Sequence, residues 1–369
     1  MLRLGFRNLF QSPTRLIVSV GGVALALMLI LSLDGILAGS ERRMTAYIDN
    51  TGADIFVAQS GVRNMHMASS SLPTSVLGEV QSIEGILDTT PILYLTNVID
   101  VGDQQFLAYI IGVDPEADFG GAWELASGRS TSGAGEIVID ETVAKKAGLS
   151  LGDQVDVLGQ SFDVVGTAKG TASMINSVAF IGLEDFFRQR GTDETISYLL
   201  ATVSGEDSPE AVAERIESNV SGVTAMPRDV FSAEEAQIIQ DMGSDIVTLM
   251  NGIGFLIGVA VTGLTIYTAT LSRKAEYGML KALGAKNSHL YITVGWQTVI
   301  SIGLGLIVAL GLTFGLTVII PLGVPELEML ILPSALVKAA TAAAAIALLA
   351  AMIPVWQITR VDPAMVFRR

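Results

Sequence analysis

Four long apolar stretches limit what this chain can fold into, because each one is long enough to cross a bilayer as a helix. The hydrocarbon core of a membrane takes about 20 helical residues, and the four expected spans are residues 16–38, 246–271, 290–320 and 334–355. The third stretch is long for one span, so it is either tilted or extends past the lipid. Only 16% of the residues are charged, against roughly a quarter in soluble domains. The sequence therefore predicts an α-helical membrane protein with four transmembrane helices.

A cleaved signal peptide is the alternative interpretation of the first stretch. Its uncharged run extends from Leu16 to Leu33, which is longer than the 7–15 apolar residues of a typical signal peptide. No clear small-residue cleavage site precedes Glu41. We therefore favour an uncleaved anchor.

The charged residues around the spans predict the orientation of the chain. Residues 1–15, 272–289 and 356–369 together hold ten basic and two acidic residues, whereas residues 39–245 hold 11 basic and 32 acidic residues, a net charge of −21. The short turn at 321–333 contains two glutamates and no base. Since basic flanks stay in the cytoplasm, we expect both termini to be cytoplasmic and residues 39–245 to lie outside. The apolar residues around Arg3 and Arg7 also predict an amphipathic helix on the inner leaflet within residues 1–15, which is compatible with a simple basic flank.

The large segment between the first two spans is typical of a mixed α/β domain. Alternating or β-branched runs separated by Gly and Asp turns predict strands at Ala53–Val57, Ile92–Val101, Gln105–Val113, Glu136–Asp140 and Gln154–Gly166. Helices are expected at Glu141–Ala147 and Ser208–Ser218, the second with Ser208 as its N-cap. Residues 57–73 are expected to form a loop, and residues 35–50 and 232–245 to continue the first two spans outward as a stalk. The predicted fold is four spans in a 1+3 arrangement with an inserted extracytoplasmic α/β domain.

The sequence contains none of the familiar catalytic strings. It has no Gly-x4-Gly-Lys-Ser/Thr phosphate loop, no HExxH, no GxSxG and no cysteine, so we expect no catalytic residue and no ATPase motif in this chain. The Met65-His66-Met67 string offers two thioethers and an imidazole, which suit a soft metal such as Cu(I). An exposed loop explains the string better, and we expect no metal site. The acidic outer domain argues against nucleic-acid binding because it would repel phosphates.

Several residues in or near the spans allow two interpretations. Met28, Met44, Met242 and Met250 lie in or near the outer halves of the first two spans, where they can form a soft surface for an amphiphile or haem. Ordinary packing explains these methionines equally well, and we favour it. The glycine pairs Gly254/Gly258 and Gly311/Gly315 predict close helix contacts within or between subunits. We expect Asp34 to be a solvated charge at the outer end of the first span.

The basic turn between the second and third spans is more informative. Residues 273–289 read RKAEYGMLKALGAKNSH, an amphipathic pattern that places apolar residues opposite Arg273, Lys274, Glu276 and Lys281. Such a helix on the cytoplasmic face can be pushed by a docked protein, although an inert membrane-surface helix would have the same pattern.

This turn also carries a resemblance to a known family. Arg273-Lys274-x-Glu276 followed by Lys281-Ala282-Leu283-Gly284-Ala285 resembles the cytoplasmic turn of MacB- and FtsX-type (type VII) ABC transporter permeases. The tail Val361-Asp362-Pro363-Ala364 is similar to the closing signature of that family, with Phe367 where leucine is usual. The resemblance continues through Arg7-Asn8-Leu9 and Pro13-x-Arg15 at the start, and through outer-domain strings at residues 112–115, 125–129, 136–139, 149–153 and 162–166.

The resemblance implies a homodimeric or pseudo-dimeric permease of the prokaryotic plasma (inner) membrane, in contact with membrane lipid and bound to two cytoplasmic ABC ATPase subunits; we expect the homodimer. ATP and Mg would act through that partner. The chain resembles the separate-subunit kind of permease, such as the DevC-like and haem-exporter permeases. On this basis the residues expected to couple to the ATPase are Arg273, Lys274, Glu276, Tyr277, Leu280, Lys281, Leu283 and Gly284.

Two functional hypotheses remain open at this point. The first is the export or extraction of a hydrophobic or amphiphilic cargo (haem, lipid, lipoprotein, peptide or drug) by mechanotransmission through the permease. The second is an FtsX-like signalling role, in which the outer domain regulates an extracytoplasmic protein such as a cell-wall hydrolase. A membrane-anchored enzyme is disfavoured, because no nucleophile–base or metal constellation is present.

Overall fold

The computed structural model describes residues 13–131, 133–173 and 176–359, and the chain divides into two compact units. Among these residues, the membrane unit comprises residues 13–39, 243–324 and 328–359, and the outer unit comprises residues 40–242 and 325–327. Most of the expected N-terminal amphipathic helix and of the cytoplasmic tail lies outside the described residues. Each unit is considered by itself below.

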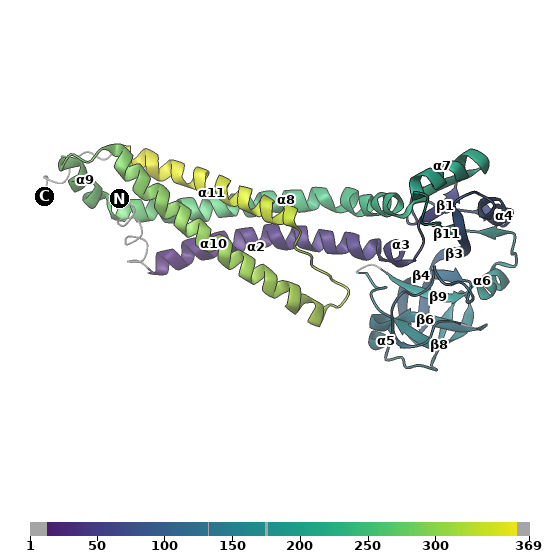
Figure 1. Cartoon of the computed structure of the whole chain (residues 1–369). Helices are drawn as coiled ribbons and strands as arrows, with labels where there is room; N and C mark the ends of the chain where they lie inside the picture. The colour runs from purple at the N-terminus through teal and green to yellow at the C-terminus, as the bar shows by residue number, and fades with distance from the viewer. Residues whose placement is uncertain (1–12, 132, 174–175, 360–369) are drawn as a thin grey trace. The chain divides into compact units, whose positions relative to one another are not determined.

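Long helices dominate the membrane unit (Figure 1). They are α2 (Pro13–Met44), α8 (Arg228–Ser272), α10 (Asn287–Gly323) and α11 (Pro333–Thr359), with the short α9 (Lys274–Ala282) between α8 and α10. In the described part of the chain, four helices are long and apolar enough to cross a membrane, and each expected span lies within one of them. The chain is thus a membrane α-helical protein in a 1+3 arrangement, with the α/β domain inserted after the first helix.

Close glycine contacts hold α2 against α8 in the membrane unit. A Cβ atom on Gly22 would overlap the side chain of Val261, and one on Gly258 would lie 3.2 Å from the Cβ of Ala26. A Cβ on Gly254 would likewise lie 3.3 Å from a methyl group of Leu29, so the first predicted glycine pair lies at a helix contact within the chain. The second pair, at positions 311 and 315, has no neighbour within 4 Å of an added Cβ among the described residues.

Asp34 differs from the solvated charge that we expected. Its carboxylate accepts hydrogen bonds from Asn251 Nδ2 at 2.8 Å and from Lys338 Nζ at 2.9 Å, and its side chain is only 13% exposed. These contacts connect α2 with α8 and α11. The expectation was wrong because it considered Asp34 only against its neighbours in sequence, whereas its partners lie more than 200 residues away. Pairing lowers the cost of holding a charge among apolar helices.

One large mixed sheet forms the framework of the outer unit. Among the described residues its strands follow the order β12-β1-β11-β3-β4-β9-β6-β8-β5, with β7 pairing to both β3 and β8, and β2 and β10 form a separate two-stranded sheet. The strands are β1 (Ile55–Gln59), β2 (Leu72–Pro73), β3 (Ile86–Val101), β4 (Gln104–Val113), β5 (Leu125–Gly128), β6 (Glu136–Asp140), β7 (Gln154–Val157), β8 (Gln160–Ala168), β9 (Ser177–Gly182), β10 (Thr195–Ile196), β11 (Tyr198–Val203) and β12 (Val223–Pro227).

The long strand β3 connects two halves of this sheet. Its first part pairs with β11 up to Ile92, and its second part pairs with β4 from Leu93 onward. Separate clusters of buried apolar side chains lie on the two halves, one built around β1, β11 and α7 (Pro209–Asn219) and the other around β4, β6 and β9. The β3–β4 pair therefore holds the residues that follow β4 in a fixed place against the rest of the sheet.

Short helices and turns of the outer unit follow the local sequence. α5 (Glu141–Ala147) has the predicted bounds; the Asp140 side chain caps it by accepting from Thr142 N, and Gly148 ends it at φ +70°. Ser208 caps α7, as expected, by accepting from Ala211 N. The run predicted at 154–166 forms the hairpin of β7 and β8. Its turn residues, Leu158 and Gly159, both have positive φ, the type favoured in two-residue hairpins. The remaining helices are α3 (Ala46–Asn50), α4 (Ser75–Gln81) and α6 (Leu183–Arg190).

Candidate functional site

The turn between α8 and α10 folds as the separate helix α9, and its end has a defined geometry. Gly284 lies at φ +92°; its N–H donates to Lys281 O at 3.0 Å, and the N–H of Ala285 donates to Leu280 O at 2.9 Å. These two hydrogen bonds form a Schellman motif, which favours glycine at this position. The Leu-Gly-Ala string therefore ends α9 and starts the turn into α10.

Tyr277 anchors α9 to the long helices on either side of it. Its side chain is only 2% exposed and packs in one cluster with Ile266 of α8 and with Leu290 and Val294 of α10. Gly278 is also buried. Tyr277 is one of the eight residues expected to couple to an ATPase, but its side chain is buried and not exposed at the surface of α9.

The opposite face of α9 is exposed and partly apolar. Leu283 is 80% exposed and Met279 is 55% exposed, and Ala275 lies on the same face, because residues four apart in a helix are neighbours. The sequence placed Met279 on the apolar side of the segment but not among the eight coupling residues. Its exposure distinguishes it from Tyr277, and only the packing of the helices reveals that difference.

The charged residues of the turn border this face. Arg273 Nη1 lies 3.4 Å from Glu276 Oε2, and the Glu276 side chain is exposed. Lys274 and Lys281 are half-buried, as is Leu280, while Gly284 is exposed. The segment thus presents a short apolar strip beside basic groups, an arrangement that suits a helix that docks into a groove of another protein.

The four methionines considered as a cargo surface have different local surroundings. Met28 packs against the buried cluster formed by α2, α10 and α11 of the membrane unit, and Met44 lines a small cavity of the outer unit. Met242 and Met250 are both exposed on α8. These last two are the members of the set that a ligand could contact directly.

The Met65-His66-Met67 string is only partly the exposed loop that we favoured. Met67 is exposed, but Met65 is buried and its N–H donates to Glu235 Oε2 at 2.7 Å. His66 Nδ1 contacts the other oxygen of Glu235, and the His66 ring packs edge-on against Tyr109, with ring centroids 4.5 Å apart. No group of three His, Cys, Asp or Glu side chains that could hold a metal occurs in the described part of the chain.

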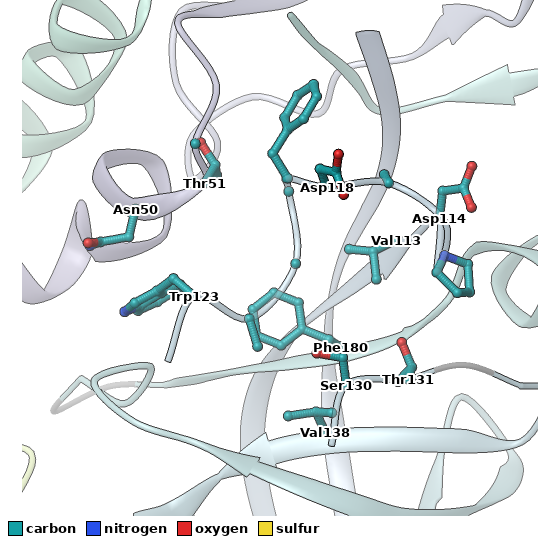
Figure 2. Close-up of a pocket in the computed structure, with 17 residues that line it drawn as sticks. Asn50, Thr51, Val113, Asp114, Asp118, Trp123, Ser130, Thr131, Val138 and Phe180 are labelled. Carbon is teal, nitrogen blue, oxygen red and sulfur yellow. The ribbon is translucent and has the colours of Figure 1, made fainter. Parts of the chain in front are cut away.

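The outer unit also contains a larger cavity, of about 260 Å³. Asn50 at the end of α3 and the two residues after it form one wall, and the loop 113–123, which leaves the end of β4 toward β5, forms another. Val138 of β6 and Phe180 of β9 lie opposite Asp114 and Asp118 (Figure 2). The sequence alone does not reveal this cavity, because its walls come from five separate segments of the chain.

Comparison with known proteins identifies the family. The model of the MacB-like periplasmic core domain matches residues 16–219, and that of the FtsX-like permease C-terminal region matches residues 248–363. Together with the four long apolar helices, these matches define a membrane-embedded permease subunit of the ABC transporter class. The chain belongs to the MacB/FtsX-type, or type VII, family of these permeases.

Individual relatives are distant but extend along most of the chain. An uncharacterised ABC transporter permease of Mycobacterium tuberculosis is 21% identical over 100% of this chain and 99% of its own length. HrtB of Staphylococcus epidermidis, whose name assigns it provisionally to a hemin transport system as a permease, is 22% identical over 88% of each chain. Among solved structures, the periplasmic region of MacB from Actinobacillus actinomycetemcomitans is 15% identical, covers 50% of this chain and 92% of that chain, and gives a TM-score of 0.39.

Proposed function

We propose that this chain couples ATP hydrolysis by a separate cytoplasmic ATPase to the export or extraction of a hydrophobic or amphiphilic cargo. The observation that carries the proposal is the exposed face of α9, where the side chains of Met279 and Leu283 are exposed beside basic residues. A soluble ATPase that bound this face would bury apolar surface that is otherwise exposed to water. Burial of such surface favours association. Tyr277 would transmit the resulting push to α8 and α10, because its ring packs between them.

The proposed assembly is a homodimer of this chain with two ATPase subunits, to which ATP and Mg bind. Exposed apolar residues along α8 support the homodimer, because they recur every three or four residues as in a helix–helix seam; they are Met242, Ile246, Leu249, Ile253 and Leu256. In this arrangement α8 of each protomer faces its partner or lipid. Mechanotransmission then means that movement of α9 reaches the outer unit through the helices that continue into it.

The class of cargo is a further part of the proposal. Met242 and Met250 present exposed thioether side chains on α8, and flexible methionine surfaces adapt to apolar ligands of varied shape. The provisional assignment of HrtB to hemin transport is consistent with a cargo of this kind. Haem, lipids, lipoproteins, peptides and amphiphilic drugs are therefore the compounds to test as stimulators of the ATPase.

The test is co-purification of the tagged chain from its native membrane in mild detergent, followed by native mass spectrometry. We expect a P-loop ATPase to accompany the chain in a complex of two permeases and two ATPases. The variants Met279→Glu/Leu283→Glu and Lys274→Glu/Lys281→Glu should each lower ATPase recovery about tenfold or more, since losing an anchor at an interface typically costs that much affinity. Membrane insertion should be unchanged in both variants.

The matched control replaces two exposed apolar residues by glutamate at positions away from α9. Leu87→Glu/Leu151→Glu replaces two exposed leucines of the outer unit and should leave ATPase recovery unchanged. Full recovery with both α9 variants would overturn the coupling role of this helix. Recovery of a cell-wall hydrolase or a sensor protein without any ATPase, under every nucleotide condition, would replace transport with the signalling function.

A further inference from the structure

The 260 Å³ cavity of the outer unit is preformed. The N–H of Gly120 donates to Thr51 O at 2.8 Å, and the hydroxyl of Tyr47 donates to Gly120 O at 2.9 Å. These bonds fix the middle of the loop 113–123 against the segment that follows α3. Gly120 lies at φ +92°, a conformation that favours glycine. A ligand would therefore meet walls that are already in place, which lowers the entropic cost of binding.

The walls combine an apolar floor with an acidic rim. Phe180 and Val138 are almost fully buried and form the floor, while Asp114 and Asp118 lie on the opposite side of the cavity (Figure 2). Trp123 adds a further aromatic side chain to the lining. Pockets of this composition bind small molecules by enclosing an apolar body and orienting it with a few polar groups.

Among the described residues, the charged side chains that line the cavity are all carboxylates. Asp114 uses one oxygen to accept the N–H of Glu116 at 2.9 Å, and Asp118 is exposed at the rim. Arg129, which precedes the lining residue Ser130, forms an ion pair with Glu136 at 2.6 Å. The surrounding segment 39–245 carries a net charge of −21, so its field repels anions and concentrates cations.

We propose that this cavity binds a small organic cation: an ammonium group held by Asp114 and Asp118, with an apolar body against Phe180 and Trp123. Carboxylates form charge-assisted hydrogen bonds with an ammonium group, and aromatic faces attract the same charge. Thr131, only 5% exposed, adds a hydroxyl group to the wall. Binding at this site does not require an ATPase, so the proposal can be tested on the permease alone and fails or succeeds independently of the coupling role of α9.

The experiment is ligand-observed NMR and calorimetry on the purified full chain in detergent. The probes are 2-phenylethylammonium, its neutral analogue 2-phenylethanol and its anionic analogue phenylacetate. We expect the ammonium to bind at least about tenfold more tightly than the alcohol, since one charge-assisted hydrogen bond is worth roughly that factor. Phenylacetate should not bind, and added salt should weaken the binding of the ammonium.

Two variants and one control locate the site. Asp114→Asn/Asp118→Asn keeps the acceptor for the N–H of Glu116 but removes both charges, and should abolish the preference for the ammonium over the alcohol. Gly121→Leu should block both ligands, because Gly121 lines the cavity and a Cβ atom added to it meets nothing within 4 Å. The control Asp103→Asn/Asp193→Asn removes two exposed acids outside the lining. It should bind the ammonium and the alcohol with the same affinities as the parent chain.

Three results would overturn the proposal. Equal losses of ammonium affinity in the control and in Asp114→Asn/Asp118→Asn would show that the ammonium is attracted diffusely to an acidic domain and not bound at a site. Equal binding of all three probes would remove the role of charge. Unchanged binding in Gly121→Leu, with a thermal unfolding midpoint equal to that of the parent, would place the ligand elsewhere.

Discussion

His66 illustrates how tertiary burial changes the chemistry of one residue in the outer unit. Burial lowers the pKa of His66 from 6.5 to about 4, so the folded protein holds a neutral imidazole at pH 7. The contact between Nδ1 and the buried carboxylate of Glu235 opposes that shift, because a nearby anion favours the charged ring. Nothing in the Met-His-Met string itself indicates either effect, since the carboxylate is supplied by α8.

The depressed pKa of His66 predicts a loss of stability in acid. The unfolded chain takes up a proton near pH 6.5 and the folded chain near pH 4, so the stabilisation is complete above pH 6.5 and is lost as the pH falls from 6.5 to 4. The full difference between these two pKa values corresponds to about 3 kcal/mol of folding stability. The contact with Glu235 reduces this amount. We expect the unfolding midpoint of the parent to drop more between pH 7.5 and pH 5 than that of His66→Gln. Parallel pH profiles for the two proteins would contradict this assignment.

The residues of α9 show what a sequence can and cannot establish about the candidate site. The basic pair, Glu276 and the Leu-Gly-Ala ending are local features, so the helix and its termination could be predicted from the sequence. The difference between Tyr277, which is buried, and Met279, which is exposed, could not be predicted, because it depends on α8 and α10 packing on one side of α9 only. For the same reason the cavity lined by Asp114 and Phe180 has no signature in any single segment.

At the scale of elements, the membrane helices were predictable and the sheet was only partly so. Long apolar runs identify spans because the bilayer imposes their length. Strand β9 is buried at every position, so buried and exposed residues do not alternate along it. Its apolar spacing therefore does not distinguish it from other apolar runs. The division of β3 between β11 and β4 depends on partners far along the chain, which no local pattern specifies.

The contact between α2 and α8 gives a prediction for a matched pair of glycines. Gly22→Ala would force its methyl group against Val261, whereas Gly21→Ala, one residue earlier, meets nothing within 4 Å. Overpacking of this kind costs about 1–3 kcal/mol, while the two changes raise helix propensity equally. We expect Gly22→Ala to lower the thermal unfolding midpoint in detergent and Gly21→Ala to leave it unchanged or raise it. Equal midpoints for the two variants would mean that α2 and α8 do not pack at Gly22.

At the scale of the whole molecule, the distribution of charge predicts which side of the membrane each segment faces. The acidic segment 39–245 and the basic turn 272–289 are joined by one expected span, residues 246–271. The positive-inside rule therefore predicts that the outer unit lies outside and that α9 lies in the cytoplasm. The same orientation is required for α9 to reach a cytoplasmic ATPase, so the topology and the proposed function stand or fall together.

The absence of cysteine from the chain makes this orientation directly measurable. Asp103→Cys lies in the exposed turn between β3 and β4, and Lys286→Cys lies in the exposed turn between α9 and α10. A membrane-impermeant maleimide should label Asp103→Cys in intact spheroplasts, and should label Lys286→Cys only in inside-out vesicles or after permeabilisation. The parent chain, without a thiol, gives the background in both preparations. The reverse pattern would place α9 outside, where no cytoplasmic ATPase could bind it, and would exclude the coupling role together with the proposed orientation.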